Sequence, residues 1–236
     1  MLQILAVAQI RDASPAGFAP VCQIGSRSCT QGGVTTSCST AKKKELAHPT
    51  STGFWEIDPK YVYYLDVRLT DELVNFFKAE KSDVMELGAG MGCYTYHLQS
   101  RGVSIRAYDG SPSIANRTNG LVHTADLSQK MSLGKPADWV ACIEVAEHVP
   151  PQYEGALISN LQEHNRKGIL LSWSSLKPPH GNGHVNPRSE QWVIARFAEL
   201  GYTVDVKASR QLRQAAQLPW FKSDLFVMRR SSPQSR

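Results

Sequence analysis

Several features that define other protein classes are missing from this sequence of 236 residues. No apolar run approaches the roughly 18 residues that a membrane-spanning helix needs, so we expect no membrane span. No motif recurs at a fixed period, which excludes solenoids and propellers. Cysteine is scarce: the five residues are an odd number, and two of them fall inside expected core elements. This usage fits a reducing compartment better than a disulfide framework, and we expect a cytoplasmic protein.

The central part of the chain, where a nucleic-acid-binding face would be expected, carries no excess of basic residues. The formal net charge is +5, but residues 1–50 and residues 229–236 each hold +3. The long segment between them is therefore slightly acidic. Because a nucleic-acid-binding domain usually carries a basic face, we expect no nucleic-acid partner.

Composition divides the chain into three parts. Residues 1–50 contain an acid-free stretch rich in Ser, Thr and Gly, and we interpret them as a disordered tail. An organelle-targeting segment is the alternative interpretation. Residues 51–229 are periodic and long enough for one domain, and residues 230–236 are a second disordered tail.

Short apolar runs alternate with helical patterns from residue 83 onward. Thr70 is expected to cap a helix before them, and Ser189 a later one. Seven strands are expected, at residues 83–87, 103–108, 121–124, 139–143, 169–173, 202–206 and 224–228. Strands that alternate with helices indicate an α/β fold, here a doubly wound and mostly parallel sheet with helices on both faces. Ligands of such sheets bind at the carboxyl ends of the strands.

The first expected strand runs into a glycine turn, ELGAGMG at residues 86–92. Glycine lets the backbone approach a ligand closely, and the start of the following helix offers free N–H groups. The spacing is G-x-G-x-G, whereas the dinucleotide fingerprint is G-x-G-x-x-G. The turn alone therefore predicts a bound ligand and leaves its kind open.

Acidic residues follow the next two strands. Asp109 ends the second strand, 21 residues after Gly88, where a carboxylate can accept hydrogen bonds from both hydroxyls of a ribose. Asp126 follows the third strand and can accept from an adenine amino group, with the Leu127 N–H beside the ring. The alternatives are a turn aspartate for Asp109 and a helix N-cap for Asp126.

The fourth strand ends in EVAEHVP at residues 144–150. Together with the glycine turn, Asp109 and the Ala-Asp-Leu run at 125–127, this motif resembles class I S-adenosylmethionine-dependent methyltransferases across residues 82–229. The EHVP run is most similar to the branch that acts on small molecules. The resemblance implies a seven-stranded Rossmann-like methyltransferase fold with the last strand antiparallel. It also implies S-adenosyl-L-methionine as the cofactor and a small-molecule methyl acceptor.

The resemblance further implies roles for individual residues. The glycine turn would hold the methionine part of the cofactor, with an acid on the preceding strand reaching its amino group through water. The acids after the second and third strands would hold the ribose and the adenine, and the fourth strand would end near the sulfonium, at the mouth of the acceptor pocket. The implied cofactor-binding residues are Glu86, Gly88, Ala89, Gly90, Asp109, Gly110, Asp126, Leu127, Glu144 and Val145.

A neutral hydroxyl or an ammonium acceptor also needs a base, and histidine is suited to this near neutral pH. His148 follows the fourth strand and His184 lies in the loop after the fifth, so we expect both at the same edge of the sheet. They are the candidate catalytic residues, with Glu144 complementing the sulfonium charge. The alternative for His148 is a polar residue that fixes a helix start, and the alternative for His184 is a loop residue without a catalytic role. His180 and His184 with Glu144 or Glu147 offer metal-ligand side chains, but no spacing fixes their geometry and we expect no metal site.

Two other functions fit parts of the pattern. A nicotinamide-dependent oxidoreductase would share the glycine turn and Asp109, and a non-catalytic module would keep the fold and the cofactor without turnover. The aromatic segment before the first helix, which includes Phe54 and Trp55, is either a lid over the acceptor or an arm packed on the core. The sequence indicates neither the acceptor atom nor the oligomeric state.

Overall fold

The computed structural model describes residues 23–24, 49–55, 64–176 and 181–231. Most of the two expected tails, at residues 1–50 and 230–236, lies outside the described residues, as does His180. Among the described helices, none is long and apolar enough to cross a membrane.

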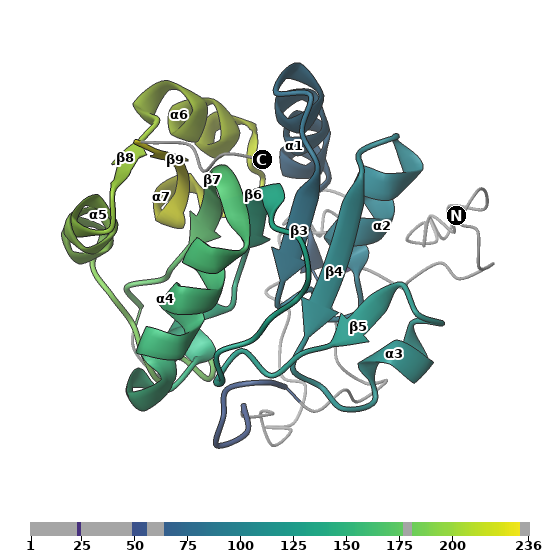
Figure 1. Cartoon of the computed structure of the whole chain (residues 1–236). Coiled ribbons are helices and arrows are strands. Elements are labelled where there is room, and N and C mark those ends of the chain that lie inside the picture. The colour runs from purple at the N-terminus through teal and green to yellow at the C-terminus, as the bar shows by residue number, and fades with distance from the viewer. Residues whose placement is uncertain (1–22, 25–48, 56–63, 177–180, 232–236) are drawn as a thin grey trace, which may run out of the picture.

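A seven-stranded sheet organises the described part of the chain (Figure 1), in the order β5-β4-β3-β6-β7-β9-β8. Its strands are β3 (Val84–Leu87), β4 (Ile105–Asp109), β5 (Val122–Thr124), β6 (Ala137–Cys142), β7 (Asn165–Ser172), β8 (Tyr202–Val204) and β9 (Leu225–Arg230). The pairs from β5 to β7 are parallel, and β9 runs antiparallel to both β7 and β8. A separate parallel pair joins β1 (Gln23–Ile24) to β2 (Tyr64–Leu65). The expected doubly wound sheet with its last strand antiparallel is confirmed.

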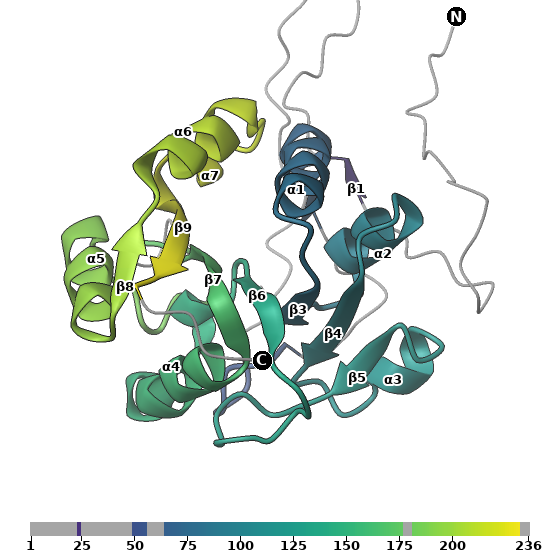
Figure 2. The same ribbon diagram turned by 45° about the horizontal axis from the view of Figure 1, so that its top comes forward.

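Helices cover both faces of this sheet, and Figure 2 shows α1 and α6 on one side of the strands and α4 on the other. The helices are α1 (Val67–Ala79), α2 (Cys93–Ser100), α3 (Ile114–Arg117), α4 (Glu154–Glu163), α5 (Glu190–Glu199), α6 (Val206–Ala215) and α7 (Phe221–Asp224). Two short 3-10 helices, η1 (Ala146–His148) and η2 (Pro151–Tyr153), lie between β6 and α4. The chain therefore leaves β6 at its carboxyl end through η1, which places this short helix at the edge where a ligand is expected.

The core consists of two apolar layers because successive strand residues point to opposite faces. On β3, Val84 packs with the layer of α1, α2 and α6, whereas Met85 packs with the layer of α4 and α5. On β9, Val227 and Met228 divide in the same way. All four side chains are at most 1 % exposed, so the central strands are covered on both faces.

Local signals at the helix starts are partly as expected. Ser189 caps α5 by accepting from the Trp192 N–H, as predicted. The prediction that Thr70 caps the first helix is wrong: α1 begins earlier, and Asp66 is its cap, accepting from the Leu69 N–H at 3.0 Å. The Thr70 hydroxyl instead donates back to the Asp66 carbonyl, one turn earlier, at 2.7 Å. The expected strand at 202–206 is also shorter, because Asp205 caps α6.

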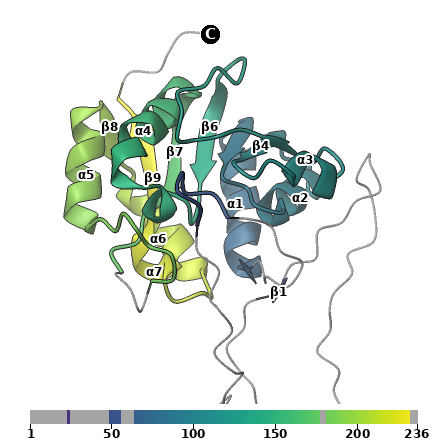
Figure 3. The same cartoon turned by 90° about the horizontal axis from the view of Figure 1, so that it is seen from below.

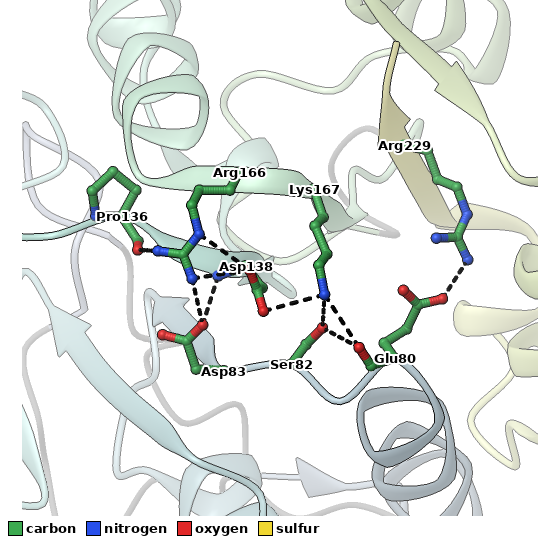
Figure 4. A network of polar contacts seen from close by, with 8 residues as sticks. All are labelled: Glu80, Ser82, Asp83, Pro136, Asp138, Arg166, Lys167 and Arg229. Atoms are coloured by element: carbon green, nitrogen blue, oxygen red, sulfur yellow. Dashed lines mark hydrogen bonds and ion pairs between the residues drawn. The ribbon is translucent and has the colours of Figure 1, made fainter. Parts of the chain in front are cut away.

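A network of ion pairs closes the amino edge of the central strands (Figure 4). Arg166 of β7 contacts Asp138 at 2.9 Å and Asp83 at 3.0 Å, and it also donates to the Pro136 carbonyl. Lys167 contacts the second oxygen of Asp138 at 3.3 Å. Burial alone would raise the pKa of Asp138, but the hydrogen bonds from these two cations hold it below its usual value. Charge pairing therefore ties together three neighbouring strands at the edge away from the glycine turn.

The two cysteines of the described domain differ. Cys142, at the end of β6, is buried and free, and burial raises the pKa of its thiol. Cys93, the first residue of α2, is disulfide-bonded. The cysteine count favoured a reducing compartment over a disulfide framework and did not predict this bond.

Candidate functional site

The glycine turn is held directly against the end of β4. The N–H groups of Gly88 and Ala89 donate to the Tyr108 carbonyl at 2.8 and 3.0 Å. Gly88 has φ +85°, and a Cβ there would lie 2.2 Å from a methyl carbon of Val145. Glycine is therefore required at position 88 for two reasons: the positive φ of the backbone and the close approach of the chain after β6.

Asp109 connects the turn to the second strand. One carboxylate oxygen accepts the Gly90 N–H at 2.8 Å, and the other accepts the Ser111 N–H at 2.9 Å. Burial raises the pKa of Asp109, although these two N–H groups favour its charged form. The glycine turn and the candidate ribose-binding acid are thus in direct contact.

The next two candidates follow β5, beside Asp109. The Ala125 N–H donates to the Asp109 carbonyl at 2.8 Å, which joins the ends of β4 and β5. The Asp126 carboxylate accepts the Ser128 N–H at 3.0 Å within its own turn, and no helix begins there. The alternative of a helix N-cap for Asp126 is therefore wrong. Leu127 is buried, with 6 % of its surface exposed.

Glu86 lies one residue before the end of β3 and is buried. The Thr95 hydroxyl of α2 donates to its carboxylate. Burial raises the pKa of Glu86 to about 7, which this hydrogen bond opposes and the nearby charge of Asp109 reinforces. Sequence reasoning missed Thr95, although its position one turn into the helix after the glycines is visible in the sequence.

Glu144 and Val145 lie at the end of β6. Glu144 has φ +58°, which is uncommon for a residue other than glycine and often marks a functional position. The conformation is held by Ser172 at the end of β7, whose hydroxyl accepts the Glu144 N–H at 2.7 Å and faces its carboxylate at 3.3 Å. Burial raises the pKa of Glu144 to about 7. Ser172 is a second residue that the sequence analysis missed.

Glu147 is fully buried, and within the described part of the chain neither of its carboxylate oxygens has a hydrogen-bond partner. Burial raises its pKa well above the usual range and the charge of Glu144 raises it further, whereas the nearby backbone N–H groups of Glu147 itself and of Ser174 oppose the rise. Its backbone carbonyl, in contrast, accepts the N–H groups of Val185 and Asn186, each at 2.9 Å. The loop after β7 is thereby tied to η1.

The two candidate catalytic histidines meet at this point, as expected from their places after β6 and β7. Their ring centroids are 5.0 Å apart, with 79° between the planes. His148 Nδ1 lies 3.0 Å from the Gly183 carbonyl, and His184 Nδ1 lies 2.8 Å from the Leu176 carbonyl. Burial lowers the pKa of His148 to about 4, so its imidazole is neutral at neutral pH. Since a carbonyl can only accept, Nδ1 carries a proton in both rings, and the neutral tautomer of either ring has its lone pair on Nε2.

The segment of residues 49–55 crosses this edge of the sheet, below the arrowheads of β3 and β4 in Figure 1. Figure 3 shows the same segment from below. A Cβ on Gly110 would lie 2.7 Å from Phe54, and a Cβ on Gly183 would lie 2.8 Å from the ring of Trp55. The Trp55 ring also packs edge-on against His148, with centroids 5.2 Å apart. The segment therefore contacts both the candidate cofactor side and the histidine pair, as a lid would.

The structure resembles solved methyltransferases. No protein-family model matches the sequence, and no curated protein matches it. Magnesium protoporphyrin IX methyltransferase from Synechocystis PCC 6803, with bound SAH, is 18 % identical over 69 % of this chain and 82 % of its own, with a TM-score of 0.53. The glycopeptide N-methyltransferase MtfA, complexed with sinefungin, is 14 % identical over 77 % of this chain and 100 % of its own, with a TM-score of 0.51.

A third similar structure is CalS10 with bound SAM, an amino pentose methyltransferase from Micromonospora echinaspora. It is 12 % identical over 68 % of this chain and 89 % of its own, with a TM-score of 0.51. The chain therefore has the Rossmann-like fold of class I S-adenosylmethionine-dependent methyltransferases, as the resemblance in its motifs implied. The nicotinamide alternative gains no support from these neighbours.

Proposed function

We propose that this protein is an S-adenosyl-L-methionine-dependent methyltransferase that acts on a small-molecule acceptor. The observation that carries the proposal is the contact of the Asp109 carboxylate with the Gly90 N–H at 2.8 Å. It joins the glycine turn to the ribose-binding candidate at the carboxyl edge of the sheet, where ligands of such folds bind. Similar folds in proteins solved with SAM, SAH and sinefungin support the proposal.

The residues present fit this cofactor. Glu86 is a buried acid and Glu144 a partly buried one, both have raised pKa values, and no cation among the described residues forms an ion pair with either. The cofactor carries an ammonium and a sulfonium, so it would supply the positive charges that these carboxylates lack. In our assignment the backbone at 88–90 and Glu86 hold the methionine part, Asp109 and Gly110 the ribose, and Asp126 and Leu127 the adenine. Glu144 and Val145 face the sulfonium.

The cofactor supplies a methyl group on a positively charged sulfur, so the work of the chain is to align the acceptor and exclude water. Phe54 and Trp55, which lie over the site, are suited to excluding water. The Nε2 lone pairs of His148 and His184 are the groups that can take a proton from a neutral hydroxyl or an ammonium. A cytoplasmic location remains a prediction, and the disulfide at Cys93 counts against it.

Calorimetry with S-adenosylmethionine and with its demethylated product tests the proposal directly. The folded wild-type chain should bind both. D109A should weaken binding about 100-fold, because two or three hydrogen bonds to a charged group are lost. D71A, which removes an exposed acid of α1, is the matched control and should bind as the wild type does.

Two results would reject parts of this assignment. Wild-type protein that unfolds cooperatively but binds neither compound excludes the methyltransferase function, and unchanged affinity in D109A excludes the ribose assignment. Quenching of tryptophan fluorescence by reduced nicotinamide cofactor would favour the oxidoreductase instead. Transfer of a radiolabelled methyl group to a cell extract separates an enzyme from a non-catalytic module of the same fold.

A further inference from the structure

One buried acid has no role in the function proposed above. Glu147 is completely buried, and neither oxygen of its carboxylate accepts a well-aligned hydrogen bond from the described residues. The backbone N–H groups of Ser174 and of Glu147 itself lie near enough to favour its charged form, but neither carries a positive charge. Burying an ionised carboxylate without compensation is far more costly than burying a neutral polar group. Such a group needs either a proton or a cation, and no side-chain cation in the described ranges pairs with it.

The two histidines beside Glu147 are arranged as metal ligands usually are. In both rings Nδ1 is held by a backbone carbonyl, at 3.0 Å for His148 and 2.8 Å for His184. A carbonyl partner on one ring nitrogen fixes the tautomer and orients the other nitrogen as a ligand. One ligand atom from each of Glu147, His148 and His184 can be chosen so that all lie within 4.8 Å of one another.

The backbone holds these three side chains in place. Glu147 and His148 are neighbours on η1. His184 comes from the distant loop after β7, but the N–H groups of the next two residues both donate to the Glu147 carbonyl at 2.9 Å. A Cβ on Gly181 would lie 2.2 Å from His184 Nδ1, so the loop backbone packs closely around the ring. The ligand set is therefore preorganised rather than a chance meeting of surface side chains.

We propose that Glu147, His148 and His184 bind one divalent first-row transition-metal ion. Two imidazoles and one carboxylate suit Zn²⁺, Mn²⁺ or Fe²⁺, and three protein ligands leave coordination positions open, as in catalytic metal sites. This proposal departs from our expectation from sequence of no metal site, because the fold brings together ligand side chains whose geometry the sequence spacing does not fix.

The metal site also narrows the chemical class of the methyl acceptor, and this inference rests on the proposed function. Two of the three ligands, Glu147 and His148, lie on the short helix that follows Glu144 and Val145, which we assign to the sulfonium side. An ion with open positions at that place would bind an acceptor through oxygen and make a hydroxyl more acidic. A hydroxyl-bearing acceptor is therefore favoured over an amine. In that case the two Nε2 lone pairs serve the ion, and the histidines do not act as bases.

The test uses the full chain after chelator treatment and dialysis, titrated by calorimetry with Zn²⁺ and, separately, with Mn²⁺. Wild-type protein should bind one ion per chain, and that ion should raise the unfolding temperature. E147Q and H184Q should each weaken binding by about tenfold or more. H123Q, which changes an exposed histidine on β5, is the matched control and should bind as the wild type does.

Opposite outcomes are equally definite. If neither ion binds wild-type protein, or if E147Q and H184Q bind as tightly as H123Q, the site does not exist and the histidines remain candidate bases. Binding of S-adenosylhomocysteine is measured on the same metal-free samples. Its loss in wild-type protein would reject the proposed function without affecting the metal result, and its retention in E147Q shows that this variant is folded.

Discussion

At the amino edge of the central strands, Asp138 contacts Arg166 at 2.9 Å and Lys167 at 3.3 Å, whereas at the carboxyl edge the buried Glu147 contacts no cation of the described residues. The two edges belong to the same sheet and both bury acids, but the pKa of Asp138 is lowered and that of Glu147 is raised. At the first edge the chain supplies its own counter-charges, so folding satisfies the acids. At the second edge the acids are left for a partner from outside the described fold, which is what a binding site requires.

The largest expected effect comes from breaking the paired edge. R166M leaves Asp138 and Asp83 without their main partner, and we expect a loss of about 3 kcal/mol in the free energy of unfolding, reduced from the fully buried case by partial exposure. R196M removes the exposed pair with Glu199 and should change stability by less than about 0.5 kcal/mol. Urea unfolding measures both. Equal losses in the two variants would show that the amino-edge network is not special.

A comparable effect, confined to high pH, should appear at the unpaired edge. The pKa of Glu86 is about 7 in the folded chain, against an ordinary value of 4.5, so the folded state holds its proton to higher pH than the unfolded state does. Stability from this group is therefore fully present below the unfolded pKa and is lost as pH rises through the folded one. E86Q keeps an oxygen for the Thr95 hydroxyl and cannot ionise.

We expect E86Q to be more stable than the wild type at pH 8, by about 3 kcal/mol, and of similar stability at pH 4. Thermal or urea unfolding across this pH range gives the free energy of unfolding of both proteins. The contributions of the other acids are the same in both, so they cancel in the difference. A difference that does not change with pH would mean that Glu86 is ionised throughout and that the contrast between the two edges is overstated. The measurement is made without cofactor.

The smallest effect concerns the glycine turn. G88A and G102A both place alanine at positive φ, +85° and +81°, but only Gly88 has a neighbour, Val145, in the path of the new Cβ. G88A should therefore cost about 1 kcal/mol more than G102A, since overpacking adds to the backbone strain. Calorimetric unfolding of the two variants checks this. Equal costs would show that Val145 moves aside freely and that the turn does not pack tightly against it.

Much of the fold was predictable because its signals are local. The apolar run of β6 and the turn at 86–92 are readable within a few residues, and all seven strands of the sheet were expected. The helix α6 was missed because its sequence is largely polar and buries only Ser209 and Leu212, so few apolar residues mark its inward face. Its cap, Asp205, was instead counted in the preceding strand.

The site was predictable in its parts rather than in its arrangement. The order of strands places Asp109, His148 and His184 at one edge, and the structure confirms that the two histidines meet. The absence of a paired cation at the Glu147 carboxylate among the described residues could not be foreseen, because it depends on which side chains of distant loops do not reach it. The role of Ser172 likewise depends on Glu144, which follows the neighbouring strand. Thr95 lies near the start of the helix after Glu86 and is visible in the sequence, but its residue type alone does not indicate the contact.

The absence of a side chain at Gly110 allows Phe54 to pack against the end of the sheet. Because a Cβ at this position would lie 2.7 Å from the Phe54 side chain, even alanine would displace the 49–55 segment from its present position. The same segment carries Trp55, which touches His148, so the disturbance would reach the histidine pair without altering any residue there. The rate at which a protease cleaves the chain near Phe54 therefore measures how tightly the 49–55 segment packs over the site.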